Sequence, residues 1–140
     1  MKETIYTTIG IIGAFFASIF GGYSPGIKIL AILMIIDYTM GMILAGVFHK
    51  SKKNKGGRLE SAAGFKGIVK KGVMLLIVFV SHEIDILIGT KFVQDATVIA
   101  FTVNEITSII ENAGLMGVPI PKTITDAIEV LKQKAEKEGE

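Results

Sequence analysis

The chain has 140 residues, of which 50% are hydrophobic and 20% are charged, and its mean hydropathy is +0.56. A soluble domain of this size needs a polar surface around its core, but the charges here gather at residues 50–71 and after residue 122. The pattern excludes an ordinary soluble domain. It predicts an all-α integral membrane protein with three to four short transmembrane helices and a short C-terminal amphipathic helix.

The first predicted span covers residues 5–20, since about 20 apolar residues cross a bilayer core of about 30 Å. One face of this helix carries small residues at spacings of three and four: Gly10, Gly13, Ala14, Ala17, Ser18, Gly21 and Gly22. Such a face lets helix backbones approach closely, either between subunits of an oligomer or within one chain. Lys2 and the apolar run would also suit a signal peptide, but Glu3 and a second apolar run argue against cleavage.

The second predicted span covers residues 29–48 and is interrupted by one charge, Asp37, whose helix face also carries Gly41 and Ala45. A central Asp costs roughly 3 kcal/mol on insertion, which the surrounding Leu, Ile, Val and Phe residues offset. Its carboxylate should face protein or water. It is therefore interpreted either as part of an oligomer interface or as a hydrogen-bond acceptor inside the monomer, with Tyr38 or Lys28 as partner.

Residues 49–71 form a basic loop that opposes many lysines to a single acid, Glu60. A short loop rich in Lys and Arg is expected on the cytoplasmic side, and its Asn and Gly residues predict flexibility over residues 52–58. At its end, Lys66, Lys70 and Lys71 are predicted to anchor the next helix at the anionic inner headgroups. From Ser61 onward the sequence is predicted to be helical, and a third span follows at about 72–90. Glu83 and Asp85 near its far end are interpreted either as a wet helix end or, like Asp37, as polar groups of an oligomer interface or lumen.

The fourth apolar stretch, residues 96–118, carries a polar stripe within an arc of about 120°. The stripe comprises Asn104 and the candidate pore residues Glu105, Ser108, Glu111 and Asn112. It suits a bundle interior or a water-lined pore, or a helix lying in the membrane interface. Two prolines then end the membrane domain, residues 1–121. Residues 122–140 are predicted to be a cytoplasmic amphipathic helix and charged tail, with both termini cytoplasmic if there are four spans.

Nothing in the sequence predicts catalysis or a cofactor. Cysteine is absent, and His49 and His82 lack the spacing of metal ligands. There is no nucleophile elbow, paired-carboxylate motif or phosphate-binding loop, and no nucleic-acid partner is expected. An enzyme is therefore not predicted.

Several short motifs occur in a distinctive order. They are Asp37-Tyr38-Thr39-Met40-Gly41, then Ser61-x-x-Gly64-x-x-Gly67-x-x-Lys70-Lys71, then Asp85, then residues 104–112, and last Gly114, Gly117, Pro119 and Pro121. In this order the chain resembles the phage lysis and toxin-secretion holins, the family that includes the clostridial toxin-export protein.

The resemblance implies a multi-pass protein of the bacterial inner membrane that interacts with lipid and with copies of itself. It would open a timed lesion that releases a muralytic enzyme or a toxin, without a required stable complex with either. Two other interpretations remain open, a small ion channel or transporter and a membrane anchor without a pore.

Overall fold

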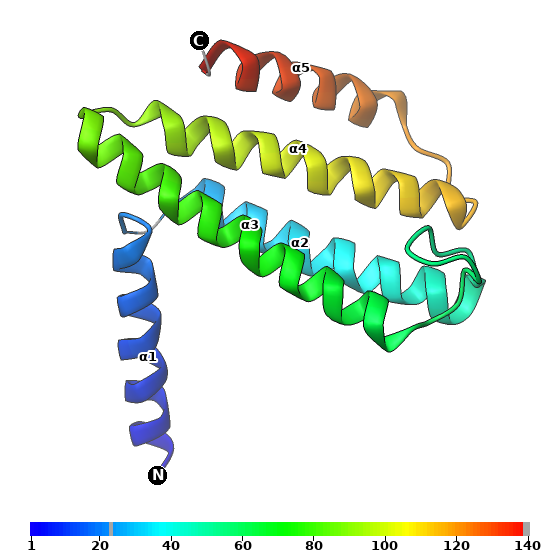
Figure 1. Ribbon diagram of the computed structural model, residues 1–140, viewed down its shortest axis with the longest axis horizontal. Helices are drawn as coiled ribbons and strands as arrows, with labels where there is room; N and C mark the ends of the chain where they lie inside the picture. The colour runs from blue at the N-terminus through cyan, green and yellow to red at the C-terminus, as the bar shows by residue number, and fades with distance from the viewer. Residues whose placement is uncertain (23, 139–140) are drawn as a thin grey trace.

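The computed structural model describes residues 1–22 and 24–138, where every regular element is helical (Figure 1). The helices are α1 (Lys2–Ile19), α2 (Pro25–Ile43), α3 (Ser61–Ile88), α4 (Phe92–Leu115) and α5 (Lys122–Glu138), and a π-helical turn, η1 (Leu44–Phe48), extends α2. The predicted helical class is therefore confirmed. The predicted tail reaches residue 140, and its last two residues lie outside the described part.

One described helical stretch, Pro25–Phe48, is long and apolar enough to cross a membrane by length and composition, with a mean hydropathy of 2.0. It corresponds to the second predicted span. The other three spans stay predictions, because α1, α3 and α4 do not pass the same test within the described residues.

The helix ends follow from local chemistry. The α2 helix begins at Pro25 rather than at residue 29, because the Ser24 side chain accepts a hydrogen bond from the Ile27 backbone N–H (3.4 Å) and proline suits the first helical position. The α3 helix begins at Ser61, well before the predicted third span, so part of the basic segment is helical. It ends at Gly89, whose φ of 72° is readily adopted only by glycine.

Four of the helices lie side by side and alternate in direction (Figure 1). Within this layer α4 contacts α2, α3 and α5, and α2 also contacts α3. The α1 helix projects away from the layer and has no buried residue. Among the described residues, Phe20 at the C-terminal end of α1 meets Phe79 edge to face, and its carbonyl accepts a hydrogen bond from Gln94.

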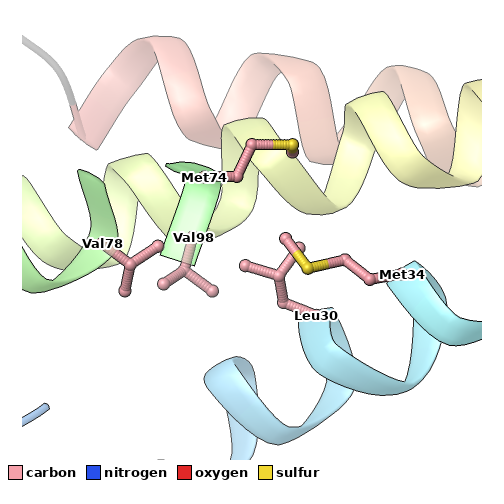
Figure 2. Close-up of a cluster of buried hydrophobic side chains, with 5 residues drawn as sticks. All are labelled: Leu30, Met34, Met74, Val78 and Val98. Carbon is pink, nitrogen blue, oxygen red and sulfur yellow. The ribbon is translucent and has the colours of Figure 1, made fainter. Parts of the chain in front are cut away.

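The hydrophobic core is a small cluster between α2, α3 and α4, formed by Leu30, Met34, Met74, Val78 and Val98 (Figure 2). Large apolar side chains remain on the outside of α1, α2 and α3. Examples are Phe15 (62% exposed), Ile35 (67%) and Leu76 (61%). A soluble protein rarely leaves apolar surface so continuous, which is typical of helices that face lipid or other chains.

The charged α5 helix lies along α4 and buries Ile128 there. Its many Lys and Glu side chains could not remain in hydrocarbon beside a spanning α4 without a large free-energy cost. In the described arrangement, the charged outer surface of α5 therefore has to face water. A spanning α4 would require α5 to leave it.

Candidate functional site

The most unusual feature of the molecule is a set of polar side chains that meet between three helices. The Lys71 ammonium, from α3, donates to Asp37 Oδ2 on α2 at 2.8 Å and to Glu105 Oε2 on α4. The Asn112 side-chain amide, also on α4, donates to Asp37 Oδ1 at 3.2 Å. We call these four residues the interhelical polar cluster. In each of these three contacts, the donor and the acceptor lie on different helices.

Helix periodicity explains how α4 supplies two members of this cluster. Glu105 and Asn112 are seven residues apart, which is about two helical turns, so they share one face. Asp37 is 5% exposed and Glu105 is 2% exposed. Charges this deeply buried cost several kcal/mol each unless they are paired. The cluster therefore ties α2, α3 and α4 together through contacts that no single helix can satisfy.

The charges in the cluster do not balance. Two carboxylates share one ammonium, which leaves a formal charge of −1 if both are ionised. Asn112 partly compensates because its N–H donates to the second oxygen of Asp37. The arrangement depends on Lys71 most of all, since it is the single cation bound to both acids.

A cavity of about 450 Å³ opens beside the cluster. Its lining comes from α2, α3, α4 and the loop before α3: Asp37, Lys53, Ala63, Lys66, Gly67, Lys70, Lys71, Met74, Asn104, Glu105, Thr107, Ser108 and Glu111. Charged and polar side chains dominate this wall. The cavity can hold water or a polar ligand, and nothing in its lining forms a catalytic nucleophile–base pair.

The glycines of the Ser61-x-x-Gly64-x-x-Gly67 motif make room for Tyr38 of α2. A Cβ added at Gly64 would lie 3.3 Å from Tyr38 Oη, and one at Gly67 would lie 3.6 Å from the Tyr38 ring. These positions give the motif a packing role, because larger residues would push α3 away from α2.

The basic loop has an ordered arrangement in the structure. Ser51 N–H donates to the Gly57 carbonyl at 2.9 Å, and the Asn54 side chain donates to the Arg58 carbonyl at 2.7 Å. Lys52 forms an exposed ion pair with Glu111 of α4. These contacts place the loop against α4, and its predicted flexibility stays a prediction.

Asp85 also differs from its predicted environment. It is 3% exposed, not a wet helix end, and it lies at the opposite end of the bundle from the basic loop. Its carboxylate accepts hydrogen bonds from Thr90 Oγ1 (2.6 Å), Val93 N (3.0 Å) and Gln94 N (2.8 Å). Asp85, which lies on α3, therefore accepts hydrogen bonds from two N–H groups at the start of α4 that have no partner within α4. Glu83 is exposed, as a wet helix end would be.

The polar stripe predicted on α4 divides into two parts. Glu105 and Asn112 point inward and are buried in the cluster. Ser108 lines the cavity, and Glu111 lies at the cavity edge, exposed and paired with Lys52. The single chain thus places the stripe against its own helices and loop. Whether the stripe lines a pore stays a prediction.

Two predicted contacts need correction. Asp37 meets Lys71 and Asn112, not Tyr38 or Lys28. Lys71 in turn is occupied by two carboxylates, whereas Lys66 and Lys70 are exposed and available to headgroups as predicted anchors. An isolated Asp in an apolar helix must find a cation, and Lys71 borders the next apolar run. Which cation meets Asp37, however, depends on how the separate helices pack.

The small residues assigned to helix packing fall into different environments. Ala45 is a buried residue of η1, and a Cβ at Gly41 would lie 3.6 Å from Lys53 Nζ. A Cβ at Gly10 or Gly13 would meet nothing within 4 Å. Ala14, Ala17 and Ser18, on the same predicted face, lie on the same projecting helix. Gly21 lies after the end of α1, and a Cβ there would come 2.5 Å from His82 Cε1 of α3. The described chain supplies no partner helix for Gly10 and Gly13, so their role stays a prediction.

Among the described residues, no group of three or more His, Cys, Asp or Glu side chains is arranged to hold a metal ion. The two histidines are far apart in the fold. His49 lies after η1 with its Nδ1 3.1 Å from the Ala45 carbonyl, and His82 lies on α3.

The chain is similar to known proteins over most of its length. Residues 14–133 match the model of the bacteriophage holin family. The chain is 34% identical over 139 residues to the uncharacterized protein Lin0175 of Listeria innocua, covering 97% of this chain and 94% of that one. It is 33% identical over 133 residues to an uncharacterized 14.9 kDa protein in the nagH 3′ region of Clostridium perfringens, covering 92% and 95%.

A phage protein is also similar. The probable holin of Bacillus phage phi105 is 34% identical over 119 residues, which cover 81% of this chain and 82% of the phage protein. No solved structure matches the chain.

Proposed function

The chain belongs to the bacteriophage holin family, and on this premise we propose that it assembles in the bacterial inner membrane into a timed lesion. Through this lesion an endolysin or a toxin would leave the cytoplasm. Family membership supports a holin function in the broad sense and implies the inner membrane as its location. Oligomerisation, the lesion and its cargo are the proposed part.

The observation that carries the proposal is the inverted distribution of side chains. Polar residues meet inside the bundle, whereas large apolar residues cover α1 and the outer faces of α2 and α3. Such a surface is compatible with lipid and with other copies of the chain. The apolar stretch Pro25–Phe48 supports insertion by its length and composition.

For the mechanism, we propose that copies associate through small-residue faces and then exchange partners in the bundle. The ion pair of Glu111 with Lys52 is exposed, and Ile128 is the one residue of α5 that is described as buried against α4. Release of α5 would free α4 to span, and its polar stripe could then face water. The basic loop, residues 49–71, would lie on the cytoplasmic side, with both termini there when four helices span.

The test is lysis coupled to a reporter enzyme. The chain is expressed inducibly in a bacterium together with a cytoplasmic muralytic enzyme that has no signal sequence, and optical density is recorded. We expect abrupt lysis after a delay, only when both proteins are present. Continued growth with confirmed membrane insertion of the chain would contradict the proposal.

A single substitution connects the lesion to the polar cluster. Asp37→Leu leaves Lys71 paired with Glu105 and removes the excess negative charge, so we expect the chain to insert and the onset of lysis to shift. Unchanged timing at equal protein level would count against a role for Asp37 in assembly. Glu60→Leu, at an exposed site on the basic segment, is the control.

The polar cavity favours one second candidate, a small ion channel. Its charged lining resembles that of a water-filled path more than that of a lipid-facing groove. Stable ionic currents at low expression, without cell killing, would support a channel in place of a lesion.

A further inference from the structure

The lysines around the cavity differ sharply in how they are neutralised. The acids of the lining are all engaged, Asp37 and Glu105 by Lys71 and Glu111 by Lys52. Lys53, Lys66 and Lys70 line the same cavity, yet none of the three forms an ion pair with a described residue. The mouth of the cavity therefore carries cationic charge that the chain itself does not balance.

The position of Lys53 concentrates this charge. Its ammonium lies 3.4 Å from the Cβ position of Gly67 on α3 and 6.0 Å from the centre of the Tyr38 ring. It thus reaches from the loop onto the helix that carries Lys66 and Lys70. Those two lysines are four residues apart and are neighbours on α3, an arrangement in which like charges destabilise a helix. A bound anion would relieve this repulsion.

We propose that the mouth of this cavity binds a phosphate group between Lys53, Lys66 and Lys70. The volume of about 450 Å³ is in the range of small-ligand sites. Ser108 and Asn104 line the same wall and offer uncharged donors. The interhelical polar cluster, with its excess negative charge, keeps the phosphate at the mouth and away from Asp37.

The headgroup of an anionic phospholipid is the source of this phosphate that fits best. Phe65, Ile68 and Val69 lie exposed on α3 beside the lysines and can contact acyl chains. Basic pockets between helices on the cytoplasmic side are known sites for such headgroups. This assignment to a lipid rests on the proposed membrane function, but the phosphate site itself does not.

The test uses the purified full chain in zwitterionic detergent micelles, with its thermal midpoint followed by circular dichroism. Phosphatidylglycerol, phosphatidylcholine and inorganic phosphate are titrated separately. A ligand that binds only the folded chain raises the midpoint as its concentration increases. We expect a rise with phosphatidylglycerol and none with phosphatidylcholine.

A charge-matched pair of variants makes the test specific. The double variant Lys66→Gln with Lys70→Gln should need about tenfold or more phosphatidylglycerol for the same rise in the thermal midpoint. Lys50→Gln with Lys55→Gln removes the same charge from exposed loop positions that do not line the cavity, and should leave the effect intact. Equal weakening in both variants, or no rise for the wild type, would overturn the site.

Inorganic phosphate separates the two sources. An equal rise with phosphate alone would uphold the phosphate site and overturn its assignment to lipid. Because this experiment involves no lysis, its failure is distinguishable from a failure of the lesion proposal. The binding experiment uses purified protein and the lysis experiment uses growing cells, so either one can succeed while the other fails.

Discussion

The α1 and α4 helices place similar apolar sequences in opposite environments. The α1 helix, with charges only at its start, buries no residue and projects from the bundle. The α4 helix carries Asp95, Asn104, Glu105, Glu111 and Asn112, yet it lies at the centre of the helical layer. The more polar helix is therefore the more buried one.

This difference indicates what organises the chain. In a soluble protein apolar area removed from water is the dominant stabilising term, but here the apolar core is one small cluster. Hydrogen bonds and ion pairs between helices position α4, whereas α1 has no such group to direct it. Polar contacts join α2, α3 and α4 beside the apolar core, and many large apolar side chains remain on the outer surface.

The largest expected effect comes from removing the cation of the interhelical polar cluster. Lys71→Met keeps the length of the side chain but leaves Asp37 and Glu105 buried without a partner charge. Breaking a buried pair in this way costs about 3–5 kcal/mol. We expect a correspondingly lower free energy of unfolding, measured in detergent by denaturant titration with circular dichroism.

Lys70→Met is the matched control, because Lys70 is the exposed neighbour of Lys71 and forms no ion pair with a described residue. Its effect on stability should stay within about 0.5 kcal/mol. Adding Asp37→Asn and Glu105→Gln to Lys71→Met should recover most of the loss. Equal effects of the two methionine variants would show that the cluster does not organise the bundle.

A smaller effect is expected at the other end of α4. Asp85→Ala removes the acceptor for Thr90, Val93 N–H and Gln94 N–H, and should cost about 1–2 kcal/mol, as the loss of a helix cap does. Hydrogen exchange should accelerate first at Val93 and Gln94. Glu83→Ala, at an exposed position on the same helix, is the control. Unchanged exchange at both amides would contradict the capping role.

The smallest effect on the single chain is expected in α1. Gly10→Leu with Gly13→Leu fills space that no described residue occupies, so the free energy of unfolding should change by less than about 0.5 kcal/mol. If α1 packs between copies, chemical cross-linking in membranes should show fewer oligomers.

Gly67→Leu gives the contrast within the same chain. It would press on Tyr38 and Lys53 and should cost about 1–3 kcal/mol. A stability loss from the α1 pair as large as that from Gly67→Leu would show that α1 packs within the monomer after all.

Helix identity could be predicted from the sequence because apolar runs and prolines mark it directly. All five helices were expected, and the ends of α2 and α4 shifted by only a few residues owing to caps such as Ser24. The start of α3 at Ser61 was also expected. Lys66, Lys70 and Lys71 interrupt its apolar pattern, but charged residues of this kind are good helix formers.

The site was predicted only in part, for a reason of geometry. Spacing along one helix shows which residues share a face, as for Glu105 and Asn112, but not which helix that face meets. The contact of Asp37 with Lys71 and the entry of Lys53 between α2 and α3 depend on how separate helices are oriented. Neither is encoded in any single segment.

The position of α5 along α4 gives the bundle two unlike rims. One rim is the charged outer surface of α5, and the other is the apolar outer surface of α3. A body of this shape cannot be surrounded by hydrocarbon on all sides without stranding charge in it. At the border of a membrane hole, however, it could turn one rim to lipid and the other to the opening. It would then act as an edge-active amphiphile that lowers the line tension of the hole.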